Sequence, residues 1–210
     1  MSYEYGIATG ADREIVREAL ANYFYPEEPL TLAHRDGPDV TVDDMENALS
    51  FLDQGTIILA RATSTRQLVG LAIGRPPTGV IVTPITTRKF AEITAFLECL
   101  SSRASGSGSS YLVTMLAVHP AHRGHSIGRR LMEEQIRLVR VRWPAVQSVT
   151  VEATSATSLR LMKRIGMCET AGLSFAEYRD DVGEQMFLGA GEVIRLEMKL
   201  RRKQTCDKSE

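Results

Sequence analysis

The stretch from residue 111 to residue 144 constrains the fold of this chain more than any other. The run YLVTMLAV, residues 111–118, is almost entirely apolar, which is typical of a strand covered on both faces of a sheet. A short turn follows, and apolar side chains then recur at helical spacing on one face, namely Met132, Ile136, Val139 and Trp143. Pro144 predicts the end of that helix. A buried strand, a tight turn and an amphipathic helix in direct succession indicate an α/β protein.

The turn RGHSIG, residues 123–128, has the composition of an anion-binding site. The first N–H groups of a helix lack intrahelical partners, and the helix dipole adds partial positive charge there. Gly124 allows a tight turn, Gly128 allows a ligand or another backbone to approach, and Arg123 and Arg129 add charge. A pyrophosphate fits this description, whereas the sequence has no Walker A pattern and no GxGxxG followed by an acid. An ordinary surface turn with a solvated arginine is the alternative.

Apolar periodicity assigns the rest of the chain to alternating helices and strands. Helices are expected at 9–24, 41–54, 86–103 and 155–167, and capping boxes opened by Thr9 and Thr41 begin the first two. Strands are expected at 3–8, 56–62, 67–74, 148–153, 168–179 and 191–200. This order predicts a mixed α/β sheet in one domain, residues 1–200, followed by a loose tail, 201–210.

Composition narrows the classes of partner and compartment. The 210 residues carry a net charge of −1, which does not favour nucleic acid or an anionic membrane as the main partner. No apolar run approaches the roughly 20 residues that span a bilayer, and the first residues lack a secretory pattern. Cys99, Cys168 and Cys206 show no CxxC spacing, and the histidines lack a convincing third ligand. We therefore expect a cytoplasmic protein without a metal.

Together with its flanking strand and helix, the turn RGHSIG resembles the coenzyme A motif of the GNAT superfamily of N-acetyltransferases, which reads Gln/Arg-x-x-Gly-x-Gly/Ala. Arg123 and Gly128 match the motif, and Ser126 stands where the family usually has glycine. If that position needs a positive φ, the serine is strained there.

The resemblance extends beyond the turn. The segments YFYPEEPL and SATSLRLMKRIGM and the last two strands are similar to those of insect arylalkylamine (dopamine-type) N-acetyltransferases, so the match runs from Tyr3 to Leu200. It implies the GNAT fold, a single-domain, mainly antiparallel mixed sheet flanked by helices, with a splayed central pair of strands.

The resemblance also implies a reaction, the transfer of acetyl from acetyl-CoA to a small primary amine such as dopamine, serotonin or tryptamine, by direct attack in a ternary complex. Glu28 would be the base, acting through water. A carboxyl with a pKa of about 4.3 is a poor base for an amine of pKa about 10, so a partly desolvated site would have to raise it. Thr154 and Ser158, spaced i, i+4, match two hydroxyls of that branch and would protonate the leaving thiolate. Met162 stands where many other GNAT enzymes have a tyrosine.

The same resemblance assigns the binding residues. The amine would contact Phe24, Glu28 and Met115. The coenzyme would lie along the backbone of Leu116, Ala117 and Val118, and it would also contact Arg123, Gly124, His125, Ser126, Ile127, Gly128, Arg129 and Ser155.

Other interpretations stay open at this point. The hydroxyls near residue 154 suit simple helix capping, and Glu27 and Glu28 suit solvated acids that follow a helix. The acceptor could instead be a polyamine, an amino acid or a protein N-terminus. A coenzyme A-binding protein without turnover is a further alternative, since Ser126 and Met162 depart from the family pattern. Catalysis by Cys99 or Cys168 is disfavoured, because both are expected in apolar surroundings.

Overall fold

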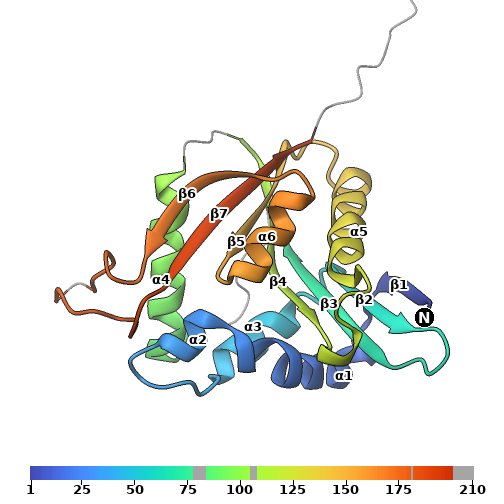
Figure 1. Ribbon diagram of the computed structural model, residues 1–210, viewed down its shortest axis with the longest axis horizontal. Coiled ribbons are helices and arrows are strands. Elements are labelled where there is room, and N and C mark those ends of the chain that lie inside the picture. The colour runs from blue at the N-terminus through green and yellow to red at the C-terminus, as the bar shows by residue number, and fades with distance from the viewer. Residues whose placement is uncertain (78–83, 105–107, 181, 201–210) are drawn as a thin grey trace, which may run out of the picture.

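A single seven-stranded sheet forms the centre of the computed structural model, which describes residues 1–77, 84–104, 108–180 and 182–200 (Figure 1). The strands are β1 Tyr3–Ile7, β2 Ile57–Ala62, β3 Leu68–Arg75, β4 Ser110–Val118, β5 Ser148–Ala153, β6 Cys168–Ser174 and β7 Glu192–Lys199. They are arranged in the order β1-β2-β3-β4-β5-β7-β6, and of these neighbouring pairs only β4 and β5 run parallel. This is the mainly antiparallel mixed sheet that the sequence predicts.

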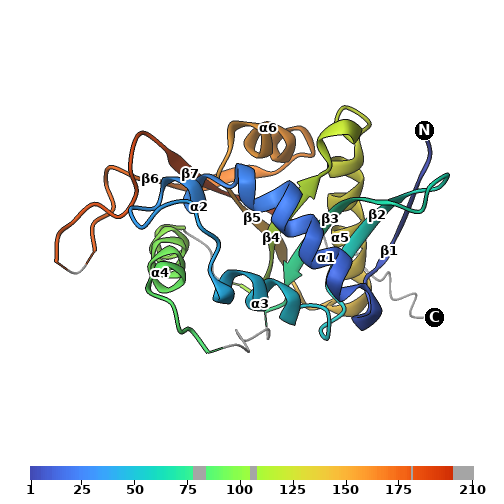
Figure 2. The ribbon, with the colours of Figure 1, turned by 90° about the horizontal axis from the view of Figure 1, so that it is seen from below.

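Helices cover both faces of the sheet (Figures 1 and 2). The helices are α1 Arg13–Ala19, α2 Pro29–Ala33, α3 Val42–Ser50, α4 Arg88–Arg103, α5 Ile127–Arg142 and α6 Ala156–Arg164. α1 and α3 pack on one face of β2 and β3, α4 packs against β6 and β7 on that same side, and α5 and α6 cover the opposite face. The chain therefore folds into three layers.

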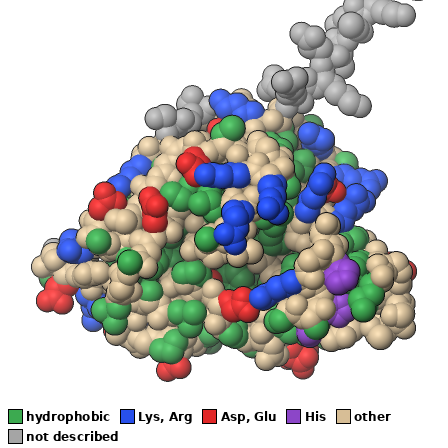
Figure 3. All heavy atoms as spheres, in the orientation of Figure 1, with side chains coloured by type: hydrophobic (Ala, Val, Ile, Leu, Met, Phe, Trp, Pro, Cys, Tyr) green, Lys and Arg blue, Asp and Glu red, His purple; other side chains and the backbone are tan. Residues whose placement is uncertain are grey.

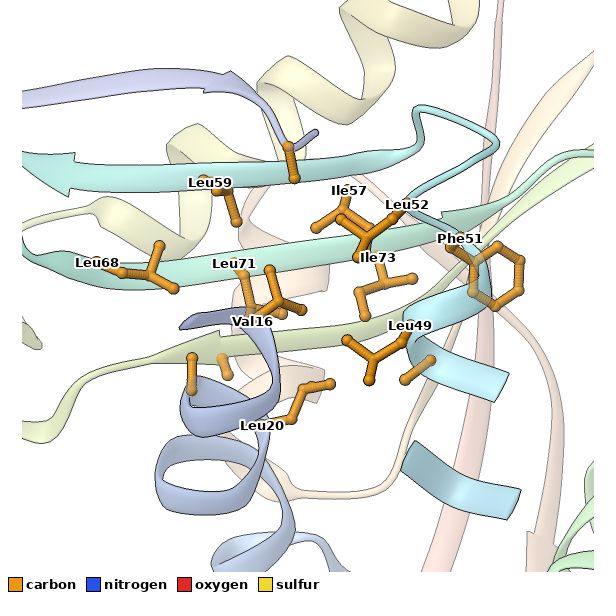
Figure 4. Close-up of a cluster of buried hydrophobic side chains, with 14 of the residues drawn as sticks. Val16, Leu20, Leu49, Phe51, Leu52, Ile57, Leu59, Leu68, Leu71 and Ile73 are labelled. Atoms are coloured by element: carbon orange, nitrogen blue, oxygen red, sulfur yellow. The ribbon is translucent and has the colours of Figure 1, made fainter. Parts of the chain in front are cut away.

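Strand alternation explains how one sheet can carry two helical layers. In β2, Ile57 and Leu59 face the cluster made with α1 and α3, whereas Ile58 and Ala60 face α5. Figure 4 shows the first cluster, in which Val16 and other apolar side chains of the helices meet those of the strands. Since both faces are buried, β2 and β3 are apolar at nearly every position.

The central strands separate part of the way along their length. β4 pairs with β5 only over Ser110–Val113, but its pairing with β3 continues to Val118. From Thr114 onward, the edge of β4 that faces β5 has no strand partner. The structure thus confirms the splayed central pair.

Local expectations hold with specific exceptions. The capping boxes at Thr9 and Thr41 are present. The helix predicted for 9–24 is instead a 3-10 turn, helix α1 and a π-helical turn at Leu20–Phe24, and the short α2 was not predicted. On the predicted face of α5, Met132 and Val139 are buried, and Ile136 and Trp143 are partly buried. The helix also packs Leu131 and Leu138 against β2 and β3. The predicted tail, 201–210, lies outside the described residues, and no described helix is long and apolar enough to cross a membrane.

Candidate functional site

The turn between β4 and α5 presents open backbone donors. Gly124 has φ of +83°, a conformation that a side chain would strain. Ser126 precedes the first residue of α5 and has φ of 60° and ψ of 17°. This position therefore needs a positive φ, and the serine is strained there. Its hydroxyl accepts no hydrogen bond from the helix, although serine usually caps this position. The first N–H groups of α5 therefore lack the usual side-chain acceptor.

Gly128 marks a close approach between two helices. A Cβ added there would lie 3.2 Å from Cδ2 of Leu161 on α6, and 3.8 Å from side-chain atoms of Leu116 and Val118 on β4. What approaches this glycine in the structure is thus a side chain rather than another backbone.

Arg123 joins two segments that the sequence singles out separately. Its Nη2 lies 2.9 and 3.0 Å from the two carboxylate oxygens of Glu27, and its Nε donates to the carbonyl of Val118 at 3.2 Å. Both charged side chains are about half exposed. Arg123 is therefore held between the end of β4 and the residue before Glu28, and it is not a freely solvated arginine. Arg129 pairs with Glu133 at 2.9 Å.

A basic groove leads away from this turn between α5 and α6. It has a volume of about 380 Å³ and is lined by four arginines, one acid paired with an arginine, and three apolar side chains, namely Arg129, Arg137, Arg140, Arg164, Glu133, Ile136, Ile165 and Met198. Figure 3 shows basic side chains gathered over this part of the surface. Its four arginines outnumber its single acid, and this net positive charge suits an anion.

Glu28 is a buried acid at the first turn of α2. It is only 8% exposed, and its Oε2 accepts a hydrogen bond from the backbone N–H of Thr31 at 2.6 Å. Burial raises the pKa of Glu28, and hydrogen bonds from Thr31, the Leu30 N–H and the Thr154 hydroxyl counteract part of that rise. The interpretation of Glu28 as a solvated acid is therefore wrong.

The structure brings Thr154 and Glu28 together, but it gives Ser158 a different partner. Thr154 follows β5, and its hydroxyl lies close enough to the Glu28 carboxyl to lower the pKa of that group slightly. Ser155 and Ser158 form a capping box at the start of α6, in which the Ser158 hydroxyl donates to the Ser155 carbonyl at 2.9 Å. The capping interpretation thus describes Ser155 and Ser158 but not Thr154.

The predicted acceptor and coenzyme contacts lie around the splayed end of β4. Phe24 and Met115 are partly buried against the cluster of α1, α3, β2 and β3. Leu116, Ala117 and Val118 are paired to β3 on one side and have no strand on the other. His125 is exposed within the turn, and its Nδ1 lies 3.1 Å from the Arg123 carbonyl oxygen. Ile127, the first residue of α5, is buried against β2 and β3.

One cluster of metal-ligand type is present among the described residues, and its groups have other partners. His34, Asp36 and Glu92 each offer one ligand atom, and these atoms lie within 4.8 Å of one another. The His34 Nδ1 accepts from the Asp36 N–H, and Glu92 is paired with Arg35 and Arg88. Cys99 packs beside the aromatic cluster of α4, but Cys168 is exposed on β6, so the expectation of apolar surroundings is wrong for Cys168.

Sequence reasoning missed the hydrogen bonds that join the start of α4 to the segments around α2 and α3. Lys89 is buried and donates to three backbone carbonyls, and the carboxylate of Asp43 accepts hydrogen bonds from Thr86 and Thr87. The available signal was the position of Lys89, which lies four residues before Ile93 on the apolar face of its helix.

Comparison with known proteins identifies close structural relatives. A model of the acetyltransferase (GNAT) family matches residues 16–167. No curated protein matches the sequence. One solved structure is that of the mosquito protein named arylalkylamine N-acetyltransferase like 5b. Its sequence is 30% identical to this chain, the TM-score is 0.85, and the match covers 95% of this chain and 100% of that one.

Two more distant structures show the same fold. A Drosophila melanogaster polyamine N-acetyltransferase that forms N-acetylagmatine is 24% identical, with a TM-score of 0.76 and coverage of 95% and 100% of the two chains. Arylalkylamine N-acetyltransferase 2 from Aedes aegypti is 19% identical, with a TM-score of 0.80 and coverage of 96% and 100%.

Proposed function

Because the chain belongs to the GNAT family of acetyltransferases, we propose that it acetylates an arylalkylamine, with acetyl-CoA as donor and Glu28 as base. The observation that carries the proposal is a buried carboxyl, Glu28, which accepts a hydrogen bond from the Thr31 N–H and lies near the Thr154 hydroxyl at the end of β5. The 30% identity to a mosquito arylalkylamine N-acetyltransferase supports the acceptor class.

The residues around the turn fit a coenzyme with several phosphates. The first N–H groups of α5 have no acceptor from Ser126, so they can bind a pyrophosphate. The unpaired edge of β4 from Leu116 to Val118 can bond an extended amide arm as an added strand would. The arginines of the groove supply charge for a further phosphate. Bound acetyl-CoA would supply the thioester carbonyl that the amine attacks.

Glu28 is suited to remove a proton from the incoming ammonium. Burial raises its pKa, which brings a carboxyl closer to the range of an effective base near neutral pH. Proton transfer through water would leave Glu28 protonated beside the Thr154 hydroxyl. The Thr154 hydroxyl would then give its proton to the departing sulfur and take up the proton held by Glu28, which returns the carboxylate to its starting state. Ser158 would assist once its hydroxyl leaves the Ser155 carbonyl.

The charges near Glu28 favour an amine with one positive charge. Glu27, the neighbour of Glu28 in the chain, is paired with Arg123, and Asp44, which like Glu28 lies near Tyr25, belongs to the capping box of α3. A polyamine needs a second carboxylate for its distal cation, and these two acids are already engaged. Phe24 and Met115 instead offer apolar surface for a ring.

Free-thiol release from acetyl-CoA tests this proposal. The assay would compare tryptamine, dopamine, serotonin and phenylethylamine with agmatine, spermidine and a short peptide. We expect kcat/KM for the aromatic amines to exceed that for agmatine by at least about tenfold. The distal cation of agmatine would lie in the site without a counter-ion, which costs more than about 1.4 kcal/mol. Turnover of agmatine or spermidine in preference to every aromatic amine would overturn the proposed acceptor class.

The proposed compartment is the cytoplasm. The two cysteines in the described part of the chain, Cys99 and Cys168, are free thiols, which is usual in a reducing environment.

A further inference from the structure

Lys89 is a buried cation in the first turn of α4. Its side chain is 6% exposed in a helix whose neighbouring inward positions are Ile93, Phe96 and Leu100. Among the described residues, no carboxylate lies within ion-pair distance of it. Burying an ammonium without a direct counter-ion is costly unless its donors are satisfied, so a specific role for the charge is indicated.

The donors of Lys89 are satisfied by the segment that follows Glu28. Its Nζ donates to the carbonyls of Thr31, Gly37 and Asp39 at 3.0, 2.6 and 2.8 Å. Three acceptors match the three N–H bonds of an ammonium, whereas a neutral amine would turn its lone pair toward one carbonyl. Burial lowers the pKa of Lys89, and the carboxylates of Asp44, Asp39, Asp36 and Glu28 oppose that shift.

Thr31 links the hydrogen bonds of Lys89 to Glu28, the proposed base. The Thr31 carbonyl accepts from Lys89, and the Thr31 N–H donates to the Glu28 carboxylate at 2.6 Å. α2 has only five residues, which is too short to be stable without tertiary contacts. The position of the Glu28 carboxyl therefore depends on what holds α2 against α4.

We propose that Lys89 is a positioning residue for Glu28, in that its ammonium fixes the segment 31–39 and thereby holds the Glu28 carboxyl at the start of α2. The effect on catalysis rests on the proposed function, whereas the effect on the Glu28 carboxyl does not. Lys89 touches neither the turn at 123–128 nor the groove between α5 and α6, so it acts on the amine side of the reaction alone.

Replacing Lys89 by Met tests the proposal, because Met keeps the length of the chain and removes the charge and all three donors. We expect kcat/KM for the amine to fall by about 100-fold, the loss typical of a catalytic group displaced by about 1 Å. The Kd for coenzyme A should change less than about twofold. The acidic limb of the pH profile should move to higher pH, because a nearby cation and the Thr31 N–H both favour ionised Glu28.

The titration of Glu28 can be followed without substrate by carboxyl NMR, with Glu28→Gln to identify its signal. The other titratable groups around Glu28 and Lys89 are unchanged in the variant, namely Tyr25, His34, Asp36, Asp39 and Asp44. We expect a higher pKa for Glu28 in Lys89→Met than in the wild type.

Phe96→Leu is the matched control, since Phe96 is buried in the same helix within an apolar cluster that includes Leu30 and Ala33 of α2, and it can donate no hydrogen bond to the segment 31–39. It should lower thermal stability while leaving the Glu28 titration unchanged. A Lys89→Met protein with the wild-type Glu28 titration, or with changes no larger than those of Phe96→Leu, would overturn the proposal. Absence of turnover in the wild type would refute the proposed function, and the NMR titration would still decide the role of Lys89.

Discussion

Replacing Ser126 by Gly should make the protein more stable and leave its coenzyme A affinity intact. Ser126 has φ of 60°, and a non-glycine residue in the left-handed region carries about 1–2 kcal/mol of strain. Its hydroxyl caps no helix N–H, so the substitution removes no capping hydrogen bond. Glycine increases the entropy of the unfolded chain, which offsets about 0.5–1 kcal/mol of that gain.

The net expectation is a gain of about 0.5–1 kcal/mol in the free energy of unfolding. In a chain of this size, 1 kcal/mol corresponds to a rise in Tm of about 2–4 °C. Urea denaturation monitored by circular dichroism measures the first quantity and differential scanning calorimetry the second. Coenzyme A affinity should not fall, because the backbone donors of α5 are retained.

Ser126→Ala is the matched control, since alanine keeps the Cβ that causes the strain and lacks the hydroxyl. It should differ from wild type by less than about 0.5 kcal/mol. A Ser126→Gly protein less stable than wild type, or a Ser126→Ala protein destabilised by more than about 1 kcal/mol, would show that the hydroxyl stabilises the turn and refute the strain argument.

Three other substitutions separate binding, chemistry and stability. Arg123→Gln should raise the Kd for coenzyme A in calorimetry but change the free energy of unfolding by less than about 1 kcal/mol, because the ion pair with Glu27 is exposed; an unaltered Kd would remove Arg123 from the binding site. Thr154→Ala should lower kcat more than Ser158→Ala, which mainly removes a helix cap, and the reverse order in thiol-release assays would contradict the assignment. Hydrogen bonds at the start of α4 lower the pKa of Asp43 to about 2, so its contribution to stability is complete above about pH 4 and is lost as the pH falls toward 2. Denaturation of Asp43→Asn and wild type should therefore differ by a constant amount above pH 5 and converge in acid, and a difference that persists unchanged at pH 2 would be inconsistent with that pKa.

Residues with strong local signals were predictable from the sequence. The apolar run at 111–118, the glycines of the turn and the periodic helix after it predicted β4, α5 and the open donors between them. Thr41 predicted the start of α3 through its capping box. In these places, local pattern and tertiary packing favour the same structure.

Other features depend on contacts between distant segments, which a single sequence does not reveal. The burial of Glu28, its closeness to Thr154 and the pairing of Arg123 with Glu27 all involve segments far apart in the chain. α2 has no periodicity of its own, because five residues held by tertiary hydrogen bonds need none. The position of Lys89 on the apolar face of its helix indicates burial, but the three carbonyls that accept its hydrogen bonds come from a distant segment.

The pH dependence of kcat/KM for tryptamine, measured in the wild type and in Glu28→Gln, tests the central claim most directly. We predict an acidic limb in the wild type, governed by a group whose pKa lies above the usual value for a glutamate of about 4.3, because burial raises the pKa of Glu28. Glu28→Gln should lose this limb and about 100-fold or more in kcat/KM, while its Kd for coenzyme A stays unchanged. A Glu28→Gln protein that keeps wild-type activity and the wild-type acidic limb would show that Glu28 is not the base.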